Sequence, residues 1–148
     1  DVILDSNGYL SSYKKIGEND EVEGTKWYAF LETAKPSGWY NGQTYLDTLN
    51  DKAVERFVEV THEKYKAKVG DEFDKTVPSI FTDEPQFSRK STLKYATDKD
   101  DVTLPWTDDL ADTFAAAYEG EDVVAGIPEL IWDRADGEIS LVRYQTGY

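Results

Sequence analysis

Two adjacent carboxylates, Asp83 and Glu84, stand where a short apolar segment, SIFT (79–82), gives way to a proline. Carboxyl groups held at the end of a strand are suited to proton transfer in acid–base catalysis. Pro85 disfavours right-handed helical angles at the residue before it, so we expect Glu84 to be extended. Successive strand residues point to opposite faces, and we therefore expect one acid to be catalytic and the other to support it. The alternative is that both begin a solvated loop.

The single histidine and the acid clusters limit the metal and triad chemistry that the chain can offer. His62 is the only histidine, which excludes a His-rich metal site and a Ser-His-Asp triad built on another histidine. It lies near the apolar face of an expected helix, where a hydrogen-bonded structural histidine is the favoured interpretation. The cluster DKDD (98–101) could hold calcium through its oxygens but lacks the spacing of an EF-hand loop. We expect no metal and no other cofactor.

Composition excludes several classes of partner. The 148 residues contain 16 Lys and Arg against 30 Asp and Glu, a formal net charge of -14. A phosphate backbone or an anionic membrane would be repelled by this charge, so neither is an expected partner. The chain has no cysteine, which removes disulfides and thiol catalysis. No apolar stretch approaches the roughly 18 residues of a membrane span, and the opening DVILDSNGYL lacks the regions of a signal peptide, so we expect a soluble chain.

The carboxylates must be positioned by the elements around them, and the clearest of these is a helix over 51–69. Its apolar residues keep the i, i+3, i+4 spacing of one helical face, and Asn50 and Gly70 suit its two ends. That face comprises Val54, Phe57, Val58, Thr61, Tyr65 and Val69. A short strand is expected over 77–82, packed on this helix, with Phe57, Val58, Tyr65 and Ile80 in a shared core.

Other elements are indicated before and after this pair. The Asn7-Gly8 pair between two apolar runs predicts an N-terminal β-hairpin, and 25–34 has the composition of a strand. A long polar connection follows the acids, from Gln86 to Thr103. Helices are expected from about residue 108 to 118, over 123–132 with a bend or restart at Pro128, and over 138–145 after an Asp136-Gly137 turn.

The order of these elements predicts an α/β fold. Strands separated by helices favour βα units with parallel strands. In such units the loops at the carboxyl ends of the strands form the binding crevice or, in a closed eightfold barrel, the catalytic face. Asp83 and Glu84 occupy that position. We expect residues 1–148 to form a single domain.

Several runs of the sequence resemble one family of enzymes. The run YLDTLNDKAVERFVEVTHEKYKAKVGDEFDKTVPSIFTDEPQF is similar to a segment of bacterial glycoside hydrolase (β/α)8 barrels, near the α-L-rhamnosidase-like group. LPWTDDLADTFAAAY and IPELIWD fit the same pattern, so the resemblance covers roughly residues 39 to 145. Its most specific parts are THEKY and FTDEP at their separation.

The resemblance implies that the chain is a carbohydrate-cleaving hydrolase, with Glu84 as an acid/base carboxylate at a strand end and Asp83 at the same rim. A complete (β/α)8 barrel needs about 250 residues. We therefore expect a segment of a (β/α)8 (TIM-type) barrel with an N-terminal β-hairpin, part of a larger catalytic domain. Glycoside hydrolysis uses two carboxyl groups, and their separation decides between retention and inversion. Asp47 is a candidate for the second carboxylate or for gripping a sugar hydroxyl; a helix-entry role near Asn50 is the alternative.

Aromatic residues supply the candidate sugar platform. A flat ring beneath the apolar face of a sugar is common in carbohydrate sites. Trp39 and Tyr40, in a loop of Gly and Asn, are the best such platform, and Trp106 stands at a helix entry. For Trp27 and Trp132, inside apolar runs, core packing is favoured.

Two alternatives to this interpretation remain open. The chain could be a non-catalytic carbohydrate-binding or structural module that keeps part of a barrel sequence, and its fold could be a small self-sufficient α+β domain. The second carboxylate distinguishes the enzyme from the module. Part of a barrel leaves strand edges and an apolar face uncovered, so we expect self-association through them.

Overall fold

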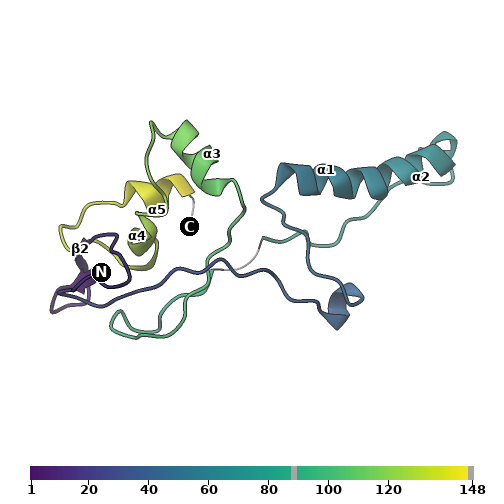
Figure 1. Cartoon of the computed structure of the whole chain (residues 1–148). Helices are drawn as coiled ribbons and strands as arrows, with labels where there is room; N and C mark the ends of the chain where they lie inside the picture. The colour runs from purple at the N-terminus through teal and green to yellow at the C-terminus, as the bar shows by residue number, and fades with distance from the viewer. Residues whose placement is uncertain (88–89, 147–148) are drawn as a thin grey trace. The chain divides into compact units, whose positions relative to one another are not determined.

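The computed structural model describes residues 1–87 and 90–146, which contain both helices and strands and belong to the α/β class (Figure 1). The described elements, in chain order, are β1 (Val2–Leu4), β2 (Leu10–Tyr13), the 3-10 helix η1 (Gly38–Tyr40), α1 (Asp51–Val60), α2 (His62–Val69), the 3-10 helix η2 (Gly70–Glu72), α3 (Leu110–Ala117), α4 (Ile127–Ile131) and α5 (Leu141–Thr146).

The described residues divide into two compact units. The terminal unit consists of residues 1–32, 90–104 and 109–146, and therefore holds both strands and the helices α3 to α5. The central unit consists of residues 33–87 and 105–108 and holds α1, α2 and both 3-10 helices. None of the helices in the described ranges is both long enough and apolar enough to cross a membrane.

The terminal unit begins with the predicted hairpin. β1 and β2 pair antiparallel, with Val2 opposite Tyr13 and a register shift after Ile3. The turn has Gly8 at φ 87°, a left-handed conformation that glycine adopts without a steric penalty. The Asp5 carboxylate accepts hydrogen bonds from the backbone N–H of Asn7, at 2.8 Å, and of Tyr9, at 2.9 Å. This side chain therefore completes a turn that Asn7-Gly8 indicates.

A small core joins the hairpin to the C-terminal part of the terminal unit. Val2, Leu10 and Trp132 form one buried cluster, and Trp132 is only 4% exposed. The ring of Trp27 meets that of Trp132 edge to face, with centroids 5.1 Å apart. The indole N–H of Trp132 donates to the Ala96 carbonyl at 2.8 Å, which satisfies the polar atom of a buried ring. The prediction that Trp27 and Trp132 are packing residues is confirmed.

The C-terminal helices form close to their predicted positions. α3 begins at Leu110, and α4 carries Pro128 in its first turn, where the missing N–H costs no helical hydrogen bond. Of the helix expected over 123–132, only Ile127–Ile131 is helical, and residues 123–126 form turns ahead of it. Gly137, at φ 76°, forms the predicted turn before α5, with the Asp136 carboxylate accepting from the N–H of Glu138 at 3.0 Å.

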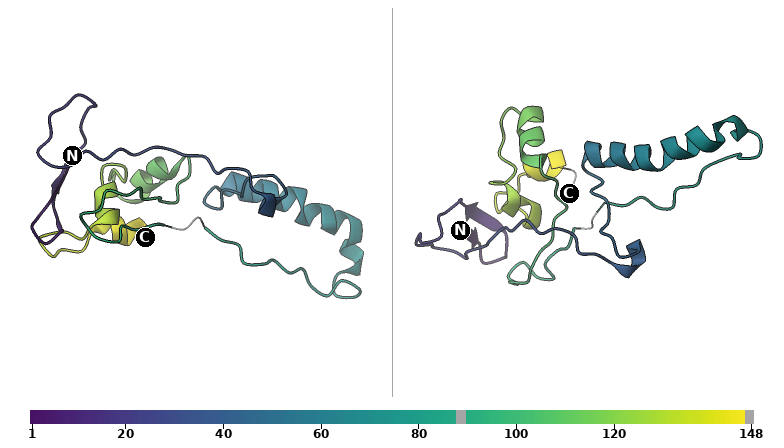
Figure 2. Two further views of the ribbon diagram at one scale, coloured as in Figure 1. Left: turned by 90° about the horizontal axis from the view of Figure 1, so that it is seen from below. Right: turned by 45° about the vertical axis from the view of Figure 1, so that its right-hand side comes forward.

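The central unit contains the predicted helix as two consecutive pieces, α1 and α2 (Figure 2). The side chain of Asn50 caps α1 by accepting a hydrogen bond from Ala53 N at 3.2 Å, as predicted. The break falls at Thr61, whose ψ is -76° and whose hydroxyl donates to the Phe57 carbonyl. A hydroxyl that bonds one turn back competes with the regular backbone pattern and bends a helix.

The strands expected over 25–34 and 77–82 are absent from the described structure, where the one sheet is the β1–β2 hairpin. The prediction that Ile80 shares a core with the helix face is wrong, because Ile80 is 52% exposed and Tyr65 is 65% exposed. β-propensity specifies that a segment suits a sheet, but each strand also needs a neighbour to pair its N–H and C=O groups. In this segment only Val77 is paired, through an isolated bridge with Phe73, and none of the described residues extends that pairing along 78–82.

Candidate functional site

The backbone at Glu84 is the most unusual feature near the predicted carboxylates. Its φ is 36°, in the left-handed region that residues with a Cβ rarely adopt. Such a conformation costs about 1 to 3 kcal/mol and persists only where the surrounding chain fixes it. The prediction that Glu84 is extended is therefore wrong. Pro85 disfavours right-handed helical angles at Glu84, as expected, but the residue takes a positive φ in their place.

The segment after Glu84 is held by hydrogen bonds to both backbone groups of Gln86, its N–H and its carbonyl. The backbone N–H of Gln86 donates to the hydroxyl of Tyr45 at 3.0 Å. The carbonyl of Gln86 accepts from the hydroxyl of Thr48, also at 3.0 Å. Two side chains from the segment before α1 thus fix the position of the chain two residues beyond Glu84. This is a local cause for the strained backbone.

Asp47 lies between the two residues that hold Gln86 and links them to a third segment. Its Oδ2 accepts from the hydroxyl of Thr107 at 2.7 Å, and Thr107 is buried. Its Oδ1 accepts from the N–H of Leu49 at 3.0 Å, which closes a turn just ahead of α1. Both oxygens therefore have a partner, and this geometry agrees with the helix-entry alternative. The same contact brings Thr107, and with it the neighbouring Trp106, to the segment 45–48.

The aromatic pair Trp39 and Tyr40 lies on η1, in the central unit. Ser37 caps this turn by accepting from Trp39 N at 3.2 Å, and Asn41 ends it in a left-handed conformation. The Tyr40 ring contacts that of Tyr45, with centroids 5.0 Å apart. Tyr40 is thereby joined through Tyr45 to Gln86. Trp39 is 89% exposed, so its ring is open to solvent.

The structure therefore places all the predicted site residues in the central unit and joins their segments by specific contacts. Tyr45, Thr48, Gln86 and Thr107 make these contacts. Their role could not be predicted, because a sequence pattern does not show which distant segments pair. Across the described residues, the carboxylates of Asp83 and Glu84 accept no hydrogen bond and form no ion pair, and both residues are exposed.

His62 has the structural role favoured from the sequence. Its Nδ1 lies 2.9 Å from the hydroxyl of Thr61, and its ring packs edge to face on Phe57, with centroids 5.5 Å apart. Both partners lie at the junction of α1 and α2. Among the described side chains there is no group of three or more His, Cys, Asp or Glu that could hold a metal ion.

A second polar centre, in the terminal unit, was missed from the sequence. The Glu129 carboxylate, in a residue only 6% exposed, accepts hydrogen bonds from Tyr13 at 2.8 Å and Ser140 at 2.6 Å and pairs with Arg134 at 3.3 Å. Burial, and then the bond to Glu129, raises the pKa of Tyr13 to about 12. The hydrogen bond from Arg134 lowers the pKa of Asp136 to about 2. The partners of Glu129 are up to 116 residues away in the chain, so local pattern could not reveal it.

Comparison of the chain with models of protein families, with curated proteins and with solved structures finds no match. The function is therefore argued from the site itself.

Proposed function

We propose that the chain is part of a carbohydrate-cleaving hydrolase in which Glu84 is the general acid/base and Asp83 supports it. The observation that carries the proposal is the left-handed backbone at Glu84, anchored through Gln86. Strained backbone at a residue with a reactive side chain is concentrated at functional sites, where the strain holds that side chain in place. The exposure of Asp83 and Glu84, whose carboxylates have no partner in the described ranges, is consistent with this role.

The chemistry proposed for Glu84 is proton transfer to the glycosidic oxygen. One carboxyl group protonates the leaving oxygen, while a second either attacks the sugar or activates a water molecule. Glu84 is the proton donor in this scheme. Within the proposal, the chain is a segment of a (β/α)8 barrel, and residues 83–84 stand at the rim where such barrels carry their catalytic side chains.

The substrate in this proposal is held by the residues around the carboxylates. The exposed ring of Trp39 stacks beneath the apolar face of a sugar, and Tyr40 extends that surface. Trp106 and the oxygens of Asp47 meet the ligand at the edge of the same unit. Asp47 already accepts two hydrogen bonds, and its role is therefore to position a hydroxyl rather than to attack the sugar.

The substitution Glu84→Gln in the full-length polypeptide tests the catalytic role. Glutamine keeps the shape of the side chain but cannot transfer the proton, an effect of about 10² to 10⁴ in rate. We expect turnover of a panel of aryl glycosides to fall by that factor, with sugar binding retained. Asp83→Asn serves as the comparison and should lower the rate less. Full turnover by Glu84→Gln would contradict the proposal.

A non-catalytic carbohydrate-binding module is the second candidate, and the exposure of Trp39 is the observation that favours it. A module of this kind binds sugar through an exposed ring and needs no proton donor. It predicts that Trp39→Ala abolishes sugar binding while no glycoside is turned over by the unsubstituted protein. Turnover that depends on Glu84 would exclude it.

A further inference from the structure

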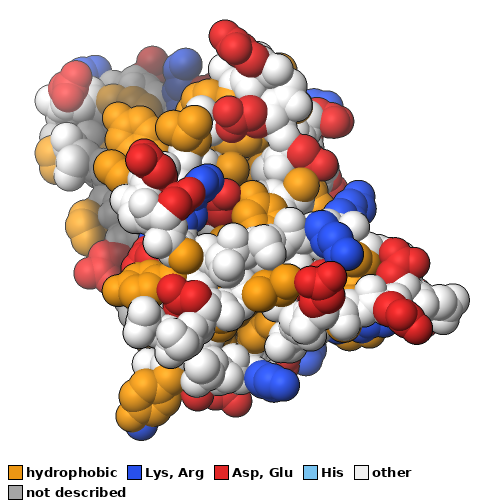
Figure 3. All heavy atoms as spheres, turned by 90° about the vertical axis from the view of Figure 1, so that its left-hand side faces the viewer, with side chains coloured by type: hydrophobic (Ala, Val, Ile, Leu, Met, Phe, Trp, Pro, Cys, Tyr) orange, Lys and Arg blue, Asp and Glu red, His pale blue; other side chains and the backbone are white. Residues whose placement is uncertain are grey.

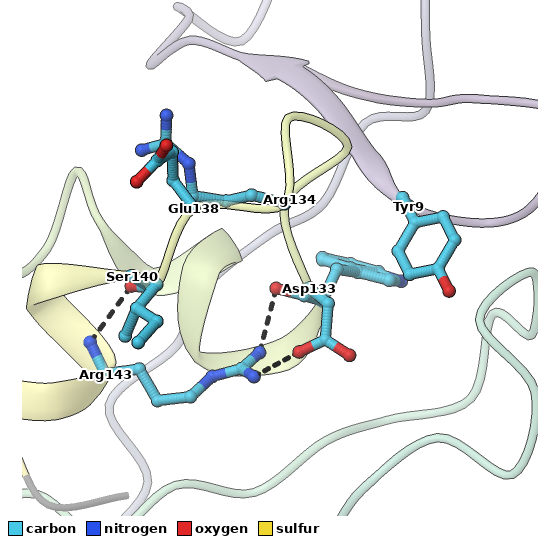
Figure 4. Close-up of a pocket in the computed structure, with 9 residues that line it drawn as sticks. Tyr9, Asp133, Arg134, Glu138, Ser140 and Arg143 are labelled. Atoms are coloured by element: carbon cyan, nitrogen blue, oxygen red, sulfur yellow. Dashed lines mark hydrogen bonds and ion pairs between the residues drawn. The ribbon is translucent and has the colours of Figure 1, made fainter.

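A cavity in the terminal unit, separate from the residues of the proposed catalytic site, has a volume of about 300 Å³. It lies between the β-hairpin and the C-terminal segment, and its polar lining comes mainly from Tyr9, Asp133, Arg134, Glu138, Ser140 and Arg143 (Figure 4). Small-molecule sites span about 300 to 1,000 Å³, so this cavity is at the lower end of their range.

Arg143 is the most firmly held of the lining residues. Its Nε donates to the Glu129 carbonyl at 2.9 Å and one terminal nitrogen to the Trp132 carbonyl at 2.8 Å. The other terminal nitrogen pairs with Oδ1 of Asp133 (Figure 4). Two backbone carbonyls and a carboxylate therefore fix the guanidinium plane. A guanidinium has five N–H groups, and Arg143 uses three of them in these bonds, so two have no partner among the residues that the structure describes.

Asp133 contributes acceptors at the same place. Its Oδ1 is occupied by Arg143, whereas its Oδ2 has no hydrogen-bond partner in the part of the chain that the structure describes. The side chain is 71% exposed, so this oxygen is accessible. Tyr9 also lines the cavity, and its hydroxyl has no partner in the described ranges. Arg143 thus provides hydrogen-bond donors, and the adjacent Asp133 provides an acceptor.

The charges of the lining balance. Asp133 and Glu138 are acidic, Arg134 and Arg143 are basic, and Arg134 is itself paired with Glu129 and Asp136. A lining without net charge gives no electrostatic preference for an ionic ligand. Acidic side chains are also spread over the face of the molecule shown in Figure 3, as the net charge of -14 requires, and this field repels anions.

We propose that this cavity is a binding site for one ring of a neutral sugar. A hydroxyl group both donates and accepts, so it can satisfy a spare N–H of Arg143 and Oδ2 of Asp133 together. Adjacent hydroxyls on a pyranose ring repeat this pattern. Tyr9 and Ile139, both exposed, supply aromatic and apolar lining for the C–H faces of the ring. This inference does not rest on the role of Glu84, because no residue of the cavity belongs to the central unit.

Titration of the full chain with D-glucose, D-galactose and D-mannose tests the site by two-dimensional NMR. We expect at least one sugar to shift the indole N–H resonance of Trp132 at concentrations up to about 50 mM, above the millimolar range of weak complexes. Asp133→Asn should weaken that binding about tenfold, as loss of a hydrogen bond to a charged group does. Asp133 is largely exposed on its side chain, so the fold should survive the change.

Two control variants separate this site from others. Asp100→Asn makes the same chemical change at an exposed position outside the cavity and should leave affinity unchanged. Glu84→Gln should also leave it unchanged, even if turnover is lost, so the two proposals can fail independently. The inference is overturned if no sugar shifts the Trp132 resonance, if Asp133→Asn binds as well as the unsubstituted chain, or if D-galacturonate binds more tightly than D-galactose.

Discussion

The left-handed backbone of Glu84 lowers the stability of the fold, and we propose that its carboxylate is kept there for its function. Asn41, Asp74 and Glu119 also have positive φ among the described residues other than glycine. Asn and Asp tolerate this region better than most residues, because their short polar side chains bond locally. Glu84 and Glu119 lack that compensation. They therefore form a matched pair for separating strain with a functional role from strain in a turn.

Glu84→Gly and Glu119→Gly should both raise the free energy of unfolding, by about 1 kcal/mol. Glycine removes backbone strain of about 1 to 3 kcal/mol. It also lowers stability by about 0.5 to 1 kcal/mol, because glycine gives the unfolded chain more conformational entropy. Only Glu84→Gly should also abolish hydrolysis in the full-length polypeptide. Urea unfolding and glycoside turnover measure the two effects. Destabilisation by Glu84→Gly would show that its carboxylate or Cβ contributes to the fold.

Tyr13 gives the fold a specific dependence on alkaline pH. The pKa of Tyr13 is about 12 in the folded chain, against 10.0 for a tyrosine without these surroundings, because burial and Glu129 disfavour the phenolate. The folded pKa is the higher one, so the stability from Tyr13 is complete below pH 10 and is lost as the pH rises toward 12. Between about pH 9.5 and 11.5, the free energy of unfolding should therefore decline less in Tyr13→Phe than in the unsubstituted chain.

The measurement is the difference between the two chains, since lysines and other tyrosines titrate over the same range. Tyr144→Phe is the matched control, because that ring is largely exposed and Glu129 accepts no hydrogen bond from it. Thermal unfolding followed at several pH values gives both curves. Parallel curves for Tyr13→Phe and the unsubstituted chain would contradict the assignment.

At the scale of elements, the predictions succeeded where the signal is local. The Asn50 cap, the Asp136-Gly137 turn and the position of Pro128 in the first turn of α4 each depend on neighbours a few residues away. The hairpin is also local, because its strands are joined by a short turn. The strand at 77–82 depends on a distant partner, and composition cannot specify one. The same limit applies to the candidate site, because the contacts of Gln86 and Thr107 that join its segments come from residues far apart in the chain.

Gly24 tests how closely the segment after the hairpin packs on β1. A Cβ added at Gly24 would lie 2.1 Å from the Val2 carbonyl oxygen, and that backbone atom cannot rotate away. Thr25 and Val2 exchange hydrogen bonds of 2.8 and 3.0 Å beside it. Gly24→Ala should therefore destabilise the chain by about 1 to 3 kcal/mol, as overpacking does.

Gly38→Ala is the control for this prediction, since nothing lies within 4 Å of the added Cβ. It should be neutral or stabilise the chain by less than about 1 kcal/mol. Chemical unfolding of both variants gives the comparison. Equal stabilities for Gly24→Ala and Gly38→Ala would mean that the segment 23–25 moves away from β1 without cost.

At the scale of the whole molecule, the apolar residues are unevenly covered. Apart from Pro105, the buried apolar residues among those described belong to the terminal unit: Val2, Leu10, Phe114, Val123, Leu130 and Trp132. In the central unit the helix face with Val54, Phe57 and Val58 remains partly exposed, and so does Phe81. Burial of apolar surface is the main stabilising contribution to folding. The central unit therefore has apolar surface available for a further contact.

We expect the isolated chain to self-associate through the apolar face of α1, and the charge of -14 to oppose this at low ionic strength. Sedimentation velocity should show larger species as sodium chloride is raised from about 20 to 300 mM, because screening weakens the repulsion between copies.

Phe57→Glu should keep the chain monomeric at high salt, since a charge on that face resists desolvation. Lys52→Gln makes the same change in net charge on an exposed position of α1 and should associate like the unsubstituted chain. A monomer at every salt concentration would indicate a self-sufficient α+β fold, and the exposed face would then need no partner.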